Sequence, residues 1–247
     1  APRRSEAARP LRAADVLICI DINDNDEGFA DLTSRYEDAL SAAGAATIAT
    51  CATEEAQGTI AFPPGVTAAN YGVVVVLTSE NWWGGANNID PEDEDVLSAY
   101  LDSGGSLLLV GQDYMYGAHP DMGETSGFPL DYLGISECYQ DVLRDTATAT
   151  ITGADGWLFE GESFTLTASS VFITNSFYPD CADPAGSAGP AFSYDEAGQD
   201  GVVVYHETRA FRTVWSGIEL AGAPTADFHH IIEVFYEWLI GGTAVEP

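Results

Sequence analysis

Four consecutive valines, Val73 to Val76, constrain the fold of this chain more than any other feature of its sequence. They belong to an uninterrupted apolar run over residues 71–78, and a run without polar alternation is typical of a strand buried on both faces. The same strand pattern occurs at 15–20, 45–51 and 106–110, and amphipathic helix patterns occur at 29–43 and 91–101. Strands that alternate with helices across short connections predict an α/β fold, a parallel sheet with helices on both faces.

The pattern changes after about residue 138. Thr-rich segments predict short strands at 146–152, 163–167 and 171–174, and the stretch 183–190 is predicted to be a surface loop. Buried strand patterns return at 201–205 and 212–216, and an amphipathic helix pattern follows at 226–240. We therefore interpret residues 138–200 as a β-rich insertion within one domain over 14–242, which follows a tail or linker at 1–13.

The chain is strongly acidic, with 39 Asp and Glu residues against 8 arginines and a net charge of −31. Nucleic acid and anionic membranes are disfavoured as partners, because both would repel the protein. Residues 1–12 hold four arginines against one glutamate, and this basic tail is expected either to be a linker remnant or to mediate self-association with an acidic body. The composition is typical of an extracellular or cell-surface protein or of a salt-adapted organism.

The four cysteines lie in two kinds of sequence. Cys138 and Cys181 stand in polar, turn-rich segments, where a structural disulfide is the expected use in an exported protein. Cys19 lies in an apolar strand, where a buried thiol is expected. Cys51 can pair with Cys19 only if the two strands are neighbours.

Several segments, taken in order, resemble a known family. They are the strand at 15–20 with its acidic residues, the helix and Gly-Gly at 95–105, the strand and turn at 106–113, the segment 175–180, the strand at 213–219 and the helix ending at 242. This order resembles the class I glutamine amidotransferase-like domains appended to secreted bacterial metallopeptidases and other exported proteins, which implies a flavodoxin-like, mostly parallel sheet. Active members carry a nucleophilic cysteine on the turn after a strand, whereas the turn here reads Gly111-Gln112-Asp113-Tyr114. The resemblance therefore implies the fold without the amidotransferase chemistry.

Three polar residues follow predicted strands. Asp113 follows 106–110, Glu219 follows 212–216 and His206 ends the strand at 201–205. Because carboxyl ends of parallel strands meet at one edge of a sheet, we expect Asp113 and Glu219 to share an edge, and with His206 they are the best catalytic candidates. None stands in a nucleophile motif, and a structural role is the simpler interpretation.

Acidic and amide residues also follow the first strand, at the same expected edge. They are Asp21, Asn23, Asp24 and Asp26. Oxygen ligands of this kind suit Ca²⁺, although Asp26 stands where an EF-hand loop needs glycine. The cluster is either a Ca²⁺ site or a solvated acidic loop, and the sequence implies no other cofactor.

Aromatic side chains accompany these residues in the loops near the same edge. They are Trp82, Trp83, Tyr114 and Tyr178, with Gln112 beside them. Flat rings stack on the apolar faces of sugars while polar groups orient the hydroxyls, so this set predicts a platform for a carbohydrate or a peptide. A lid over the hydrophobic core is an equally good interpretation of the tryptophan pair.

Together these features predict a non-catalytic accessory or interaction domain of an exported protein. Its ligand would be a divalent cation, a carbohydrate or a peptide, and its partners would be other domains of a parent protein. The alternative is a hydrolase with a degenerate or unrecognised nucleophile.

Overall fold

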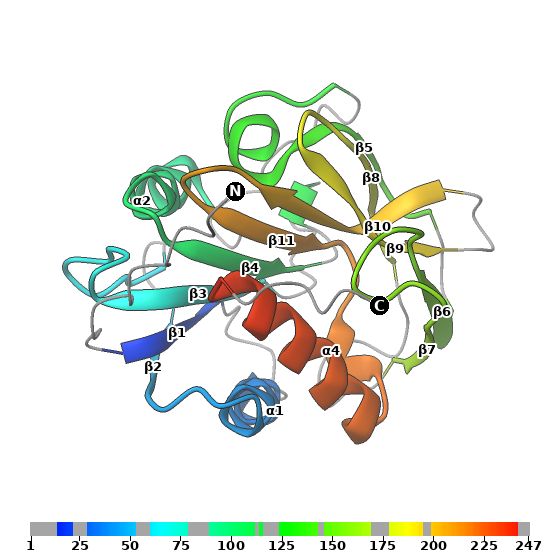
Figure 1. The fold of residues 1–247 in the computed structure, drawn as a ribbon, viewed down its shortest axis with the longest axis horizontal. Helices are drawn as coiled ribbons and strands as arrows, with labels where there is room; N and C mark the ends of the chain where they lie inside the picture. The colour runs from blue at the N-terminus through cyan, green and yellow to red at the C-terminus, as the bar shows by residue number, and fades with distance from the viewer. Residues whose placement is uncertain are drawn as a thin grey trace, which may run out of the picture.

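The structure of this protein is a computed structural model that describes residues 14–21, 29–52, 60–78, 89–111, 114–115, 124–142, 146–168, 178–194 and 199–241. Nine strands form one sheet in the order β2-β1-β3-β4-β11-β10-β9-β6-β7 (Figure 1). Their bounds are β1 Ala14–Asp21, β2 Ile48–Ala52, β3 Tyr71–Thr78, β4 Ser106–Val110, β6 Thr148–Gly153, β7 Ser163–Thr167, β9 Ala188–Tyr194, β10 Gln199–Glu207 and β11 Arg212–Ser216. A separate ribbon pairs β5 (Ile135–Tyr139) with β8 (Cys181–Pro184).

Helices cover the two faces of the sheet unequally. Figure 1 shows α1 (Phe29–Ala42) and α4 (Thr225–Leu239) on one side and α2 (Pro91–Asp102) on the other. The apolar residues of α1 and α4 share one core with alternate residues of β1, β3 and β4. The intervening residues of the same strands pack against α2, the β5–β8 ribbon and η1 (Pro129–Leu133), a single π-helical turn. The doubly buried strands predicted from the valine run are therefore confirmed.

The start of α2 shows how local sequence sets an element boundary. The Asp90 carboxylate accepts hydrogen bonds from the amides of Glu92 and Asp93 at 2.7 and 2.9 Å. Pro91 occupies the first helical position, where its missing N–H costs nothing. The start of the helix predicted at 91–101 is therefore confirmed.

The flavodoxin-like, mostly parallel sheet expected from the sequence is wrong. β2, β1, β3, β4 and β11 run parallel, but β10, β9, β6 and β7 continue the same sheet in antiparallel pairs. The strands assigned to an insertion at 138–200 therefore mostly belong to the main sheet. The stretch 183–190, predicted to be a loop, contributes to β8 and β9, and the strand predicted at 171–174 lies outside the described residues.

The cysteine prediction is also corrected. Cys19 and Cys51 form a disulfide between β1 and β2, where the parallel register places them opposite each other. Cys138 and Cys181 are both buried thiols. In the β5–β8 ribbon Cys138 pairs with Ala182, and Cys181 pairs with Tyr139. Because neighbouring residues of a strand point to opposite faces, the two thiols lie on opposite faces of the ribbon. No helix in the described part of the chain is long and apolar enough to cross a bilayer.

Candidate functional site

The carboxyl ends of the parallel strands form the candidate site, because they meet at one edge of the sheet. Thr78 of β3 pairs with Asp21 of β1, and Val110 of β4 pairs with Ser216 of β11. Glu219 follows β11 at this edge. Asp113 lies outside the described residues.

Glu219 is a buried carboxyl group at this edge, with only 3% of its surface exposed. Its Oε1 accepts hydrogen bonds from the Tyr36 hydroxyl at 2.9 Å and from the Ala221 amide at 2.8 Å. The bond to Ala221 caps the start of the 3-10 turn η2 (Leu220–Gly222). Burial raises the pKa of Glu219 to about 7, against the opposing effects of these two hydrogen bonds. Burial and the adjacent Glu219 also raise the pKa of Tyr36 well above its ordinary value.

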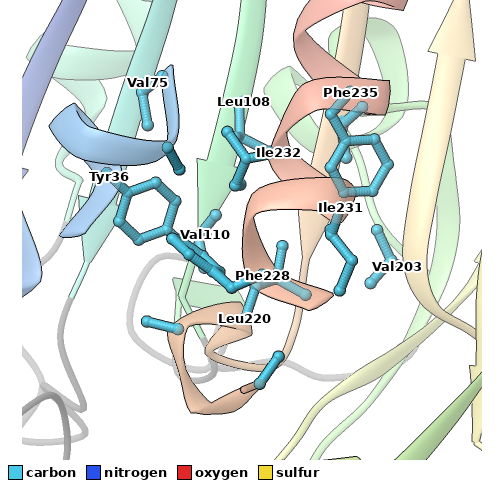
Figure 2. Packing of buried hydrophobic residues seen from close by; sticks show 14 of the residues in the cluster. Tyr36, Val75, Leu108, Val110, Val203, Leu220, Phe228, Ile231, Ile232 and Phe235 are labelled. Carbon is cyan, nitrogen blue, oxygen red and sulfur yellow. The ribbon is translucent and has the colours of Figure 1, made fainter. Parts of the chain in front are cut away.

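Arg35 extends this buried cluster toward α4. Its guanidinium donates hydrogen bonds to the Ala223 carbonyl and, at 3.4 Å, to the Thr225 hydroxyl. It also lies 4.7 Å from the centre of the Phe228 ring. Figure 2 shows Tyr36 directed toward Phe228, and their ring centres are 5.0 Å apart at 87°. The contacts of this cluster therefore connect α1 to η2 and to the start of α4.

The turn after β4 is the position where the amidotransferase-like pattern would place a nucleophile. The Gly111 amide donates to the Ser216 carbonyl at 3.0 Å. A Cβ atom on Gly111 would lie 1.6 Å from the Thr78 hydroxyl oxygen, so only glycine fits between the two strands. Gln112, predicted to bind a ligand, lies outside the described residues.

Of the aromatic residues predicted to form a platform, the structure describes Tyr114 and Tyr178. Tyr114 is fully buried, and its hydroxyl donates to the Glu94 carboxylate at 2.8 Å. Tyr178 is half-buried just before β8. Trp82 and Trp83 lie outside the described residues. Tyr114 is thus a core residue of this edge.

His206 lies at the opposite edge of the sheet from Glu219. Because β10 runs antiparallel to β11, His206 pairs with Thr213 near the beginning of β11, whereas Glu219 follows the end of that strand. The His206 Nδ1 lies 3.1 Å from the Tyr132 carbonyl, and the ring packs edge-on against Phe211. The structure therefore does not bring the predicted histidine and glutamate together. The reversal of β10 separates them, and the sequence pattern did not reveal that reversal.

Two of the described nucleophilic groups near this edge are buried, Ser216 and Cys138. Ser216 is buried and donates to the Ile218 carbonyl at 2.7 Å. Burial and the nearby Asp180 raise the pKa of the Cys138 thiol far above its ordinary value, which suppresses the reactive thiolate. A hydrolase needs a nucleophile next to a base, and the described residues of this edge do not assemble such a pair.

The predicted Ca²⁺ ligands cannot be placed. Asn23, Asp24 and Asp26 lie outside the described residues, as does the side chain of Asp21. Within the part of the chain that the structure describes, no group of three or more His, Cys, Asp or Glu side chains is arranged to hold a metal ion.

Sequence reasoning missed the partners of Glu219. Tyr36 belongs to the apolar stripe predicted for the helix at 29–43, and the sequence marks it only as a core residue. Its hydroxyl contacts a residue 183 positions away. A buried tyrosine needs a hydrogen-bond partner, which is the one signal that could have suggested a polar cluster here.

Comparison with known proteins gives similarities of fold. No protein-family model and no curated sequence matches the chain. A GH42 β-galactosidase from G. stearothermophilus is similar with a TM-score of 0.60 and 11% identity, over 94% of this chain and 30% of that one. Also similar is a β-galactosidase from the Antarctic haloarchaeon Halorubrum lacusprofundi, with a TM-score of 0.56 and 14% identity over 92% of this chain and 30% of that one. The carbohydrate deacetylase Agd3 is similar with a TM-score of 0.57 and 13% identity, over 95% of this chain and 33% of that one. The chain spans about a third of the length of these structures.

These neighbours correct the family resemblance drawn from the sequence. They are enzymes that act on carbohydrates, and the assignment to glutamine amidotransferase-like domains is contradicted. The physical reason is that the motifs behind that resemblance lie in the strands and helices of the parallel part of the sheet. They carry no information about the antiparallel half of the sheet.

Proposed function

We propose that this chain is a non-catalytic accessory or interaction domain of a larger, exported protein that acts on carbohydrates. The observation that carries the proposal is the state of Glu219: the strand-edge carboxyl is 3% exposed and hydrogen-bonded to its own chain. A carboxyl with a pKa near 7 is suited to proton transfer, but a general acid must reach its substrate. Here the group instead joins α1 to η2.

The neighbouring structures support the carbohydrate context. In the two β-galactosidases and the deacetylase, the similar region is about a third of a longer polypeptide. The disulfide between Cys19 and Cys51 supports an oxidising, extracellular or cell-surface location. A carbohydrate or peptide ligand, or Ca²⁺ at residues 21–26, remains part of this proposal.

A turnover assay tests the non-catalytic role. The substrates are nitrophenyl β-galactoside and β-mannoside, an acetylated chito-oligosaccharide, glutamine and an aryl ester. We expect rates equal to the buffer blank. Turnover that disappears in Glu219→Gln and persists in Glu237→Gln, a matched change at an exposed carboxylate, would overturn the proposal and establish the hydrolase alternative.

Binding is measured separately by the melting temperature, because a ligand that binds only the native state must raise it. The probes are galacto-oligosaccharides, manno-oligosaccharides and Ca²⁺ with and without EGTA. A rise with an oligosaccharide supports the carbohydrate ligand, and a fall on adding EGTA supports the ion. An unchanged transition with every probe would remove the ligand and leave only interactions with neighbouring domains.

A further inference from the structure

We propose that the edge of β7 pairs with β7 of a second copy of this chain, joining two nine-stranded sheets across a twofold axis. β7 is the last strand of the sheet and pairs with β6 on one side only among the described residues (Figure 1). The opposite terminal strand is partly capped, because the Ala52 carbonyl at the end of β2 accepts a hydrogen bond from the Ala61 amide at 3.2 Å. Among the described residues no strand pairs with the outer side of β7, although η2 packs against this strand.

The backbone of β7 presents hydrogen-bonding groups to that side. The Gly153 amide donates to the backbone carbonyl of Glu162, and the Ala168 amide donates to the backbone carbonyl of Ala147, both at 2.9 Å. These bonds show that the even-numbered residues along β7 direct their backbone groups toward β6. Since the direction alternates along a strand, Ser163, Thr165 and Thr167 direct their N–H and C=O groups outward.

The side chains of β7 match their own twofold image. Phe164 and Leu166 are buried in the core, while Ser163, Thr165 and Thr167 are exposed on the other face. An antiparallel pairing centred on Thr165 places Ser163 opposite Thr167 of the second copy and Phe164 opposite Leu166 of the second copy. Buried side chains therefore lie opposite buried side chains, and hydroxyl side chains lie opposite hydroxyl side chains. All three outward residues fall in hydrogen-bonded positions, which gives up to about six backbone hydrogen bonds.

The charge of the protein favours contact at this place over other surfaces. The chain carries a net charge of −31, yet β7 itself contains no charged residue, proline or register irregularity of the kind that usually protects an edge strand. The nearest acid, Glu162, lies 3.0 Å from the His230 ring nitrogen. In the proposed pairing Glu162 faces Ala168 of the second copy, so no two carboxylates are brought together.

A hydroxyl ladder already crosses this end of the sheet. Thr150 and Thr165 are joined by a 3.2 Å hydrogen bond between their hydroxyl oxygens, and Thr152 and Ser163 by one of 3.1 Å. Pairing of β7 with its copy extends this ladder across the twofold axis. Cross-strand Thr and Ser pairs of this type stabilise sheets.

The test measures molar mass by light scattering after gel filtration, over a range of protein concentrations and at low and high NaCl. We expect a monomer–dimer equilibrium that shifts toward dimer as salt rises, because salt screens the repulsion between like-charged copies. Self-association through the basic tail would have the opposite salt dependence. A monomer at every concentration and salt, or a dimer that salt dissociates, overturns the proposal.

Two matched aspartate variants locate the contact. In Thr165→Asp the two new charges lie roughly 5.5 Å apart across the axis, and dimer affinity should fall at least about tenfold. In Thr150→Asp, one strand further in, they lie roughly 14 Å apart, beyond the screening length at physiological salt, so affinity should change less than about threefold. Equal effects of the two variants overturn the assignment to the β7 edge.

A cross-linking variant keeps the test decisive if Thr165→Asp fails to fold. Under oxidising conditions Thr165→Cys should form a covalent dimer that is visible on a non-reducing gel, because directly opposed antiparallel residues have Cα atoms within disulfide range. Thr150→Cys is the control and should remain monomeric. Cross-linking of Thr150→Cys without that of Thr165→Cys contradicts the proposal.

Discussion

Glu219 shows how one buried side chain can make the stability of the whole protein depend on pH. Its pKa is raised from the ordinary value of 4.5 to about 7, with burial as the largest cause. A carboxyl group whose pKa is raised by folding contributes stability that is fully present below the unfolded pKa and is lost as pH rises through the folded pKa. The relevant window therefore runs from about pH 4.5 to pH 7.

We predict that Glu219→Gln flattens this part of the pH profile. The shift corresponds to a loss on the order of 3 kcal/mol in the unfolding free energy of the wild type across the window. The variant should lose that component, measured by urea unfolding at each end of the window. Glu237→Gln, at an exposed carboxylate, is the control. A variant with the same slope as the wild type would contradict the assigned pKa.

A second prediction at residue scale concerns Gly111. Gly111→Ala should lower the unfolding free energy by about 2–4 kcal/mol, because the new Cβ would lie 1.6 Å from the Thr78 hydroxyl oxygen. Thr78→Ala removes that oxygen, so the double variant should be less destabilised than the sum of the single changes. Additive effects in chemical unfolding would show that the two residues are not in contact.

At the scale of elements, the disulfide is the covalent link between two neighbouring strands. Cys19 and Cys51 are 32 residues apart in the sequence and join β1 to β2. In the chain-entropy description, a loop of this size contributes about 3–4 kcal/mol to the unfolding free energy. We predict that a reductant lowers the melting temperature. The double variant Cys19→Ala and Cys51→Ala should be insensitive to it, whereas Cys138→Ala should keep the full reductant effect.

The elements predicted from periodicity are mostly present. β3, β4, β7 and β11 have the predicted bounds because each is a continuous or strictly alternating apolar pattern between clear breaks. β5, β8 and β9 were missed, since their burial depends on which elements lie beside them and not on a local pattern. The same limitation hid the reversal of β10, which moved His206 to the edge opposite Glu219.

At the scale of the whole molecule, the net charge of −31 opposes the compact state. We predict that the melting temperature rises with NaCl and levels off once screening is complete. Replacing the exposed Asp38, Asp95 and Asp155 by Asn should reduce the initial slope. An unchanged slope in this variant would show that salt acts by a mechanism other than screening.

The sequence by itself determined the strands and helices of the parallel half, the start of α2 and the shared edge of β1, β3, β4 and β11. Those features follow from apolar periodicity and from residues close in the chain. Only the tertiary structure decided that the Thr-rich strands extend the same sheet, that Cys19 pairs with Cys51 and that Glu219 is bound by Tyr36. Each of these depends on contacts between distant segments, and a local pattern contains no record of its distant partner.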